Sequence, residues 1–222
     1  MNSLFRKGIY LTITAVVLYS LSCQAASISL PKPLLTGTVS VEEALAKRRS
    51  IRTYSSDPLK IEEAGQLLWA AQGISGAGGK RTAPSAGAQY PLELYLVAGA
   101  VSGVKPGIYR YLPENHSLEP VAAGDLRAQL AANAGMQGFI KDAPAMVIFC
   151  ANYGKAGRYA ERGRAFVDFE VGHAAENLAL EAVALGLGSV MIGAYDVTAL
   201  GKSLNIPASL TAVYVVPVGH SR

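Results

Sequence analysis

The longest helical pattern in the chain, at residues 164–187, is the feature that most limits how the chain can fold. Its apolar residues cover most of the helix surface instead of one stripe: Phe166, Phe169, Ala174, Leu178 and Leu185, with many alanines. A helix that is apolar on most sides needs cover from several neighbours or from a second subunit. We therefore expect this helix to be buried or to form a dimer contact, with Gly186 and Gly188 marking its end.

Strand and helix patterns alternate along the rest of the chain. Strands are predicted at residues 92–97 (half-buried), 107–112 and 117–121 (a hairpin), 145–151 (buried), 189–193 and 211–218. Shorter helices are predicted after Ser40, with Val41, Leu45 and the stem of Arg48 as its stripe, at 61–72, at 125–132 and after Asp196. Strands mixed with longer helices predict an α+β or α/β sandwich. The 222 residues, 50% of them apolar, suit one domain with a substantial core.

The first 25 residues resemble a secretory signal peptide. Arg6 and Lys7 precede a mostly apolar run at 9–21 and then small residues. That run would rise only about 20 Å as a helix, which is short for a bilayer core. We predict a signal peptide at 1–25, an extended lead-in at 26–39 and one domain at 40–222, in a protein exported to the periplasm. A lipoprotein anchored at Cys23 and an uncleaved N-terminal anchor are the alternatives.

The charge balance gives no general case for nucleic-acid or membrane binding. Without Arg6 and Lys7, 18 basic residues face 16 acidic residues. We expect no nucleic-acid partner and no stable membrane span after cleavage of the signal. Cys23 falls in the leader, and Cys150 lies in an apolar strand pattern, so we predict a buried core thiol and no internal disulfide.

Two loops invite a ligand-binding interpretation. Residues 73–79 hold four glycines ahead of Lys80 and Arg81, but they lack the positions that a Walker A phosphate loop requires, so we interpret them as a flexible loop. Residues 83–91 combine two prolines, a glycine and small side chains. This composition predicts a stiff loop whose backbone a flat ligand could approach closely.

A basic cluster at residues 48–52 follows the first predicted helix. It contains three arginines and a serine: Arg48, Arg49, Ser50 and Arg52. The guanidinium fork matches phosphate oxygens and stays charged at physiological pH. The cluster therefore predicts either a phosphorylated ligand or a solvated basic helix end, which the helix dipole also favours.

The sequence supports no metal, thiol or serine site. Glu170 and His173 have the spacing of a carboxylate-bridged metal pair, but the second pair is missing. We therefore expect His173 in an ordinary, satisfied polar position. Because no catalytic acid, base or nucleophile stands out, a cofactor is the expected source of chemistry.

Four segments in order, at residues 48–54, 84–95, 186–196 and 216–220, resemble the signature blocks of the nitroreductase superfamily. The pattern is most similar to the SagB-type dehydrogenases, which include thiazole/oxazole-forming oxidases, and it spans about residues 40–222. The resemblance implies an α+β fold: a three-layer sandwich with a central, mostly antiparallel sheet between helices, in a homodimer. It also implies FMN held at the subunit interface.

The resemblance assigns cofactor contacts by position. The block that holds the FMN phosphate and ribityl chain matches Arg48, Arg49, Ser50 and Arg52. The loop against the isoalloxazine, commonly supplied by the partner subunit, matches Pro84, Ser85, Ala86 and Gly87. The segment whose backbone N–H faces flavin N5 matches Ile192, Gly193 and Ala194. Arg222 ends the chain where relatives continue to a basic pair that reaches the phosphate, and it is assigned that role here.

Two further positions depart from the family pattern. Ala88 stands where many nitroreductases have asparagine. Arg158 and Tyr159 stand where azoline oxidases have a Lys-Tyr pair, and arginine cannot accept a proton as lysine does.

The sequence therefore predicts an FMN-dependent oxidoreductase of the nitroreductase type. Hydride would pass from NAD(P)H or an organic substrate to an acceptor that the sequence does not identify. Peptide azoline oxidation and non-catalytic flavin binding are the alternatives. The expected partners are a small-molecule substrate or electron donor and a second copy of the chain.

Overall fold

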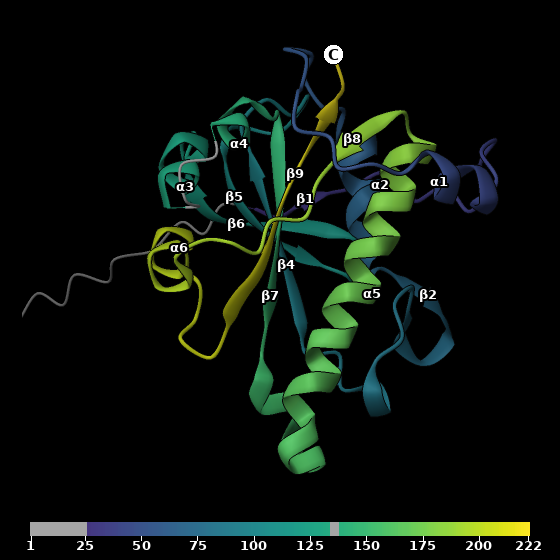
Figure 1. Cartoon of the computed structure of the whole chain (residues 1–222), viewed down its shortest axis with the longest axis vertical. Coiled ribbons are helices and arrows are strands. Elements are labelled where there is room, and N and C mark those ends of the chain that lie inside the picture. Colours follow the sequence, from purple (N-terminus) through teal and green to yellow (C-terminus); the bar gives the residue numbers. More distant parts are fainter. Residues whose placement is uncertain (1–25, 134–137) are drawn as a thin grey trace, which may run out of the picture.

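A seven-stranded antiparallel sheet forms the centre of the protein, seen here in a computed structural model that describes residues 26–133 and 138–222 (Figure 1). The strands are β1 (Ile28–Ser29), β4 (Leu92–Ala98), β5 (Gly107–Leu112), β6 (Ser117–Ala123), β7 (Ala145–Ala151), β8 (Leu187–Ser189) and β9 (Thr211–His220). Their order across the sheet is β1-β6-β5-β4-β7-β9-β8, and every neighbouring pair is antiparallel. The C-terminal strand β9 therefore lies inside the sheet, between β7 and β8.

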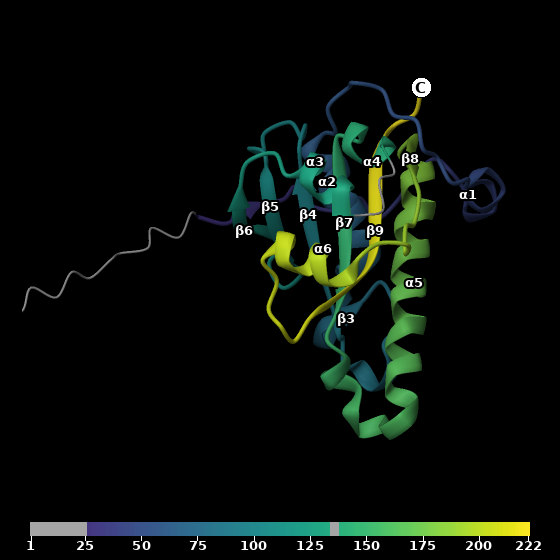
Figure 2. The ribbon, with the colours of Figure 1, turned by 60° about the vertical axis from the view of Figure 1, so that its left-hand side comes forward.

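Helices cover both faces of this sheet (Figure 2). One face carries α2 (Ile61–Gln72) and α5 (Gly163–Ala184), with α1 (Val41–Lys47) against α5. The other face carries α3 (Arg127–Asn133), α4 (Phe139–Asp142) and α6 (Val197–Leu204). Alternate residues of β7 enter the two cores, Phe149 on the α2–α5 side and Ile148 on the other. The predicted three-layer α+β sandwich is confirmed.

The prediction that strand 92–97 is half-buried was wrong. Six of the seven residues of β4 are buried, because helices cover both faces of the sheet and leave no solvent side. The neighbouring strand β7 is buried throughout, and the Cys150 thiol lies in the core as predicted. Burial raises the pKa of this thiol, so it stays protonated and inert.

Side-chain caps set the helix starts that the sequence predicted. Ser40 Oγ accepts a hydrogen bond from the Glu43 N–H at 3.1 Å, and Asp196 Oδ1 accepts one from the Ala199 N–H at 2.9 Å. The predicted apolar stripe of α1 was wrong, because Val41 and Leu45 are exposed and Ala44 is the residue that α1 buries.

Residues 73–79 were wrongly predicted to form a flexible loop. They contribute to a small antiparallel hairpin, in which β2 (Ile74–Gly76) pairs with β3 (Lys80–Arg81) across a short 3₁₀ turn. The predicted strand at 189–193 is also shifted. Strand β8 ends at Ser189, and Ile192 makes only an isolated bridge to Val215.

The lead-in at 26–39 contains no helix and one short strand, β1, which pairs with β6. The predicted signal peptide lies outside the described residues. Within residues 26–133 and 138–222, no helix combines the length and apolar character needed to cross a membrane.

Two glycines of the α5 region predict opposite effects of the same substitution. Gly186 follows the helix with φ +72°, and no atom lies within 4 Å of an added Cβ, so Gly186→Ala should cost about 1 kcal/mol through backbone strain alone. Gly172 lies inside α5 with equally open space and an ordinary φ, so Gly172→Ala should stabilise by about 0.5–1 kcal/mol. Urea unfolding of both variants measures this, and shifts of the same sign would contradict the assigned conformations.

Candidate functional site

The edge of the sheet at β8 brings together three of the four signature segments. The Ile51 N–H donates to the Ser189 carbonyl at 3.0 Å, which joins the basic cluster to β8. The Tyr54 hydroxyl donates to the carbonyls of Ile51 at 2.8 Å and Pro217 at 3.3 Å, which joins the same segment to β9. Residues 48–54, 186–196 and 216–220 are thus neighbours, although more than 130 positions separate the first from the second.

Close packing of backbone holds this junction together. A Cβ added to Gly188 would lie 2.5 Å from Ile51 Cγ2, so glycine is required at this point. On the other side of β9, a Cβ added to Gly219 would lie 2.5 Å from Pro144 Cδ. The signature glycines therefore let the strand backbones approach the segment that carries the arginines.

A cavity of about 210 Å³, named here the cation cavity, opens at this junction. Its lining residues are Lys47, Arg49, Ile51, Ala179, Val183, Gly186, Leu187, Gly188, Ser189 and Ser221. Two of them are cations and none is acidic. The cavity therefore offers a net positive, hydroxyl-containing surface to an anion.

The four residues of the basic cluster that were predicted to bind phosphate have different surroundings in the structure. Arg49 lines the cavity, its Nη1 donates to the Arg48 carbonyl at 2.7 Å, and it makes no ion pair among the described residues. Arg48 instead pairs with Glu176 of α5, at 3.3 Å between Nε and Oε1. Ser50 is exposed and bridges to Ser189, and Arg52 is exposed with a long 3.5 Å contact to the Ser50 carbonyl. Of the three arginines, Arg49 is therefore the one that lines the cavity and can bind an anion without first breaking an ion pair.

Lys47 is a cavity residue that the sequence interpretation missed. It ends α1 and pairs with Glu43 one turn earlier in the helix. The sequence feature that could have identified Lys47 is its position in the last turn of the helix, where the helix dipole favours cations.

The segment 192–194 lies further along the same edge. Ile192 exchanges two backbone hydrogen bonds with Val215, at 2.9 and 3.0 Å, and Gly193 and Ala194 beyond it are exposed. At about 3.3 Å per residue, Ile192 is roughly 10 Å from Ser189 and the cavity. Arg222 is exposed next to Ser221, which lines the cavity.

The loop residues Pro84, Ser85, Ala86 and Gly87 are not part of this site in the same chain. Ser85 and Ala86 lie against Val167 and Glu170, in the first half of α5, whereas the cation cavity lies against Val183. The 13 residues from Glu170 to Val183 correspond to about 20 Å along the helix. One protomer therefore holds the two halves of the predicted cofactor site apart.

The conformation of this loop is fixed by local contacts. Ser85 Oγ accepts a hydrogen bond from the Tyr90 N–H at 2.9 Å, and Gly87 adopts φ +57°. A Cβ on Gly87 would overlap the Arg158 guanidinium, which donates to the Tyr159 hydroxyl at 2.6 Å. The Arg-Tyr pair therefore packs directly on the predicted isoalloxazine loop. Ala88 is exposed in this loop with φ +53°.

Glu170 lies behind the loop and was missed as a loop-supporting residue. Its side chain is buried, and its Oε1 has no hydrogen-bond partner in the described structure. Burial raises the pKa of Glu170, although hydrogen bonding from Ser85 and Gln72 and the charges of Arg81 and Lys155 oppose the increase. His173, one turn further along the helix, is exposed to solvent. Within the described residues, no three His, Cys, Asp or Glu side chains gather as a metal site.

The raised pKa of Glu170 predicts how stability depends on pH. A carboxyl whose pKa is higher in the folded state contributes stability below its unfolded pKa of about 4.3 and loses it as the pH rises through the folded pKa. Glu170→Gln should therefore raise the Tm at pH 8 by about 2–4 °C, corresponding to about 1 kcal/mol, and this gain should disappear near pH 4. Thermal unfolding at both pH values tests this, and a gain that does not change with pH would exclude titration of Glu170 as the cause.

The chemistry of the cation cavity fits the phosphate end of FMN. Lys47 and Arg49 supply charge, Ser189 and Ser221 supply hydroxyls, and no carboxylate in the lining opposes an anion. The exposed backbone at Gly193 and Ala194 lies on the same sheet edge, beside the Tyr214 ring, whose Cε1 is 3.5 Å from the position of a Cβ added to Gly193.

Comparisons with known proteins agree with the fold. The model of the Nitroreductase family matches residues 45–220. MJ1384, a nitroreductase-family protein of Methanocaldococcus jannaschii, is 41% identical over 183 residues, which cover 82% of this chain and 91% of that protein. A crystal structure of a nitroreductase-family protein from Ralstonia eutropha superposes with a TM-score of 0.79 at 29% identity, over 91% of this chain and 92% of that one.

The Microcin B17-processing protein McbC of Escherichia coli is a more distant relative. It is 27% identical over 143 residues, which cover 62% of this chain and 53% of McbC, so the match spans about half of that protein. The family model and the 41% identical relative both match most of this chain, and the sheet and its helices have the family's fold. The chain therefore belongs to the nitroreductase family, a family of oxidoreductases.

Proposed function

We propose that this protein is an FMN-dependent oxidoreductase of the nitroreductase type. The observation that carries the proposal is the cation cavity, in which Arg49 makes no ion pair with any residue that the structure describes and no lining residue is acidic. Bound FMN would accept a hydride from a donor and pass it to an acceptor.

The chain's own residues would bind and orient the cofactor. Lys47 and Arg49 would hold the phosphate, with Ser189 and Ser221 as hydroxyl partners. The backbone at Gly193 and Ala194 would present N–H donors to the ring, because the Ile192 N–H already donates to the Val215 carbonyl. Because no carboxylate, imidazole, thiol or phenol lines the cation cavity, positioning and electrostatics are the protein's expected contribution there.

We further propose that the active form is a homodimer. The loop at 84–87 lies about 20 Å along α5 from the cation cavity of its own chain, so a second copy is needed to bring such a loop to that cavity. Apolar side chains that are more than half exposed gather on the lead-in and α1: Leu34, Leu35, Val41 and Leu45. Such residues are a suitable surface for burial by a partner.

The absorbance spectrum of the purified protein tests the proposal directly. We expect flavin bands from bound FMN, and bleaching of those bands when a competent donor is added without oxygen. NADH and NADPH are tested first, followed by organic substrates. A colourless protein that does not bind added FMN would overturn the proposal, and bound FMN that no donor reduces would favour the non-catalytic alternative.

Azoline oxidation on a modified peptide is the second candidate. The similarity to McbC favours it, whereas the Arg158–Tyr159 pair, packed on Gly87 of the predicted isoalloxazine loop, departs from the Lys-Tyr pattern of azoline oxidases. Arg158 cannot accept a proton, so Tyr159 would be the only group of this pair able to exchange one. Conversion of a thiazoline-containing peptide to the thiazole, followed by mass spectrometry, distinguishes this activity from nitroreduction.

The proposal includes export of the mature protein to the periplasm. It rests on the charged, apolar and small-residue segments at residues 1–26. N-terminal sequencing of protein recovered from the cell envelope should begin near residue 26, and an intact Met1 in the cytoplasm would contradict export.

A further inference from the structure

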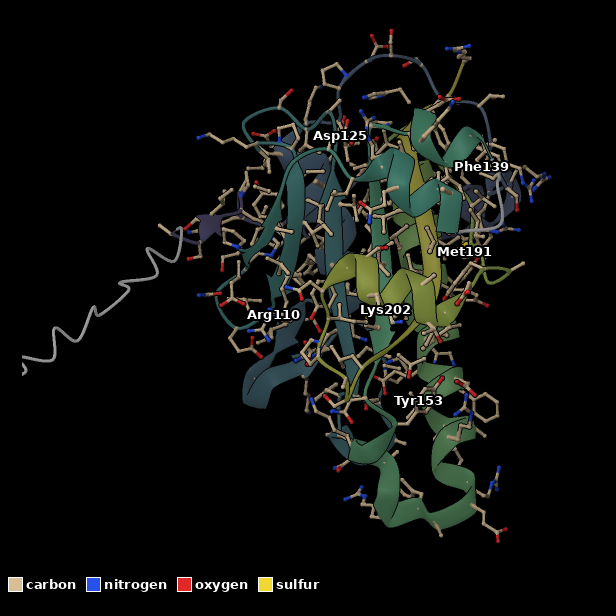
Figure 3. All side chains as sticks on the ribbon, turned by 90° about the vertical axis from the view of Figure 1, so that its left-hand side faces the viewer. Arg110, Asp125, Phe139, Tyr153, Met191 and Lys202 are labelled. Carbon is tan, nitrogen blue, oxygen red and sulfur yellow. The ribbon has the colours of Figure 1, made fainter. Side chains whose placement is uncertain are left out.

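A second cavity, of about 200 Å³, opens at the end of the sheet where β4 begins and β5 ends. It is lined by Gln72, Arg81, Tyr90, Leu92, Glu93, Leu94, Arg110, Tyr111, Leu112, Pro113, Glu114 and Lys155. None of these residues lines the cation cavity. Arg110 of this lining lies on β5 and is labelled at the left of Figure 3, with Met191 at the right.

Arg81 is a largely buried cation in this cavity. Its side chain is only 13% exposed, and its guanidinium lies 4.9 Å from the centre of the Tyr90 ring. Among the described residues its single ion pair is with Glu114, at 3.4 Å, and that carboxylate is 69% exposed. Ion pairs with a solvated carboxylate contribute little and open readily, so Arg81 has no strong counter-ion of its own.

Gln72 supports Arg81 in the same wall. Arg81 Nη1 donates to Gln72 Oε1 at 3.0 Å, and because a guanidinium has no acceptor, this contact fixes which way the amide faces. The Gln72 side chain is only 1% exposed, and hydrogen bonding from its amide acts to lower the pKa of the buried Glu170 carboxyl. Gln72 therefore holds the Arg81 fork in place and offers no free donor to a ligand.

The other charges around the cavity leave it positive in its interior. Arg110 is neutralised by Glu119 at 2.9 Å and Glu93 at 3.6 Å. Lys155 makes no ion pair among the described residues and donates to the Tyr90 carbonyl at 3.3 Å. Glu170 lies behind Gln72, where burial raises the pKa of its carboxyl and the charges of Arg81 and Lys155 oppose that increase. Among the ion pairs of the described residues, Arg81 has only the exposed carboxylate of Glu114, and Lys155 has none.

We propose that this cavity binds a small carboxylate, with its oxygens on the Arg81 fork and the Lys155 ammonium. The volume suits a molecule of amino-acid size and is below the range of pockets that hold larger ligands. A single negative charge is favoured over a phosphate dianion because Glu93 and Glu114 stand at the rim. A bound carboxylate would displace Glu114 from Arg81, at little cost.

Calorimetric titration of the purified protein tests the proposal with three probes: propionate, propanamide and alanine. Propionate should bind saturably, and propanamide, which has the same shape without the charge, should not. If alanine competes with propionate and binds more tightly than propionate, the ligand is a free amino acid. If propionate binds more tightly than alanine, the ligand is a simple organic acid.

Variants distinguish this cavity from the cation cavity. Arg81→Gln should weaken propionate binding about tenfold or more, and Lys155→Gln, at an exposed position, several-fold. Arg81→Lys keeps the charge without the fork and should give an intermediate loss. Arg49→Gln is the matched control, because it removes one arginine charge from the cation cavity and should leave propionate binding unchanged.

Far-UV circular dichroism and the Tm of each variant show whether it is folded, and Lys155→Gln provides a test that does not disturb a buried group. The proposal is wrong if propanamide binds as well as propionate, or if folded Arg81→Gln and Lys155→Gln proteins both bind propionate as the wild type does. It is also wrong if Arg49→Gln abolishes propionate binding, which would place the anion in the cation cavity. None of these results depends on whether the protein uses FMN.

Discussion

Replacing Arg49 with glutamine is expected to weaken FMN binding about 100-fold. Arg49 lines the cation cavity with no ion pair of its own, so its charge-assisted hydrogen bonds would go to the phosphate, and the loss of two such bonds accounts for a change of this size. Arg48→Gln should have an effect about tenfold smaller, because Arg48 is already paired with Glu176. Flavin fluorescence titration of each purified apoprotein measures the affinities.

Riboflavin provides the control for this prediction, because it shares the ring of FMN but lacks the phosphate. The wild type should prefer FMN over riboflavin strongly, and Arg49→Gln should lose most of that preference with little change in riboflavin affinity. Lys202→Gln removes the same charge from α6 (labelled in Figure 3), on the opposite face of the sheet from α5, and should change FMN binding by less than about twofold. If Arg49→Gln retains the full preference for FMN, Arg49 does not hold the phosphate.

Mixing two inactive variants is expected to restore activity if the active site is shared between subunits. Arg49→Gln removes the phosphate contact, and Gly87→Val alters the loop at a residue with φ +57°, where a β-branched side chain is strained. In a mixed dimer, one site combines the wild-type Arg49 of one subunit with the wild-type loop of the other. Random pairing then yields about a quarter of the wild-type number of intact sites, from two proteins that are each nearly inactive.

The experiment requires subunit exchange, followed by measurement of bound FMN and of turnover. The control mixes Arg49→Gln with Lys202→Gln, a variant that keeps both Arg49 and the wild-type loop. It shows how subunit exchange by itself affects bound FMN and turnover. Sedimentation should confirm that both single variants remain dimeric. If the mixture is no more active than its components, each site is built within one chain, and the homodimeric arrangement proposed here is wrong.

Local patterns predicted most of the elements, because caps and periodicity are local. The start of α1 at Ser40, the extent of α2 and the buried strand β7 follow from residues within each segment. The burial of both faces of β4 could not be predicted in this way, because the alternation of side chains in β4 does not reveal that a second helical layer covers its outer face.

The candidate site was predictable as segments but not as an arrangement. The resemblance identified residues 48–52, 84–87 and 192–194, whereas the structure places the first and third together on one sheet edge and the second some 20 Å away along α5. Arg48 is ion-paired and Arg49 is not because Glu176, more than 120 positions later in the chain, lies next to Arg48. Likewise, the cavity at Arg81 depends on Gln72 and Lys155, which no local pattern connects.

The position of β9 has a consequence for how this chain is made. Residues 211–220 are made after every other strand of the described sheet, yet they form the strand that joins β7 to β8. The sheet therefore cannot close until these residues have been made, and a shorter nascent chain keeps unpaired strand edges. Pairing of such distant segments is slow. Removal of residues 211–222 should therefore leave a product that aggregates instead of a shorter enzyme.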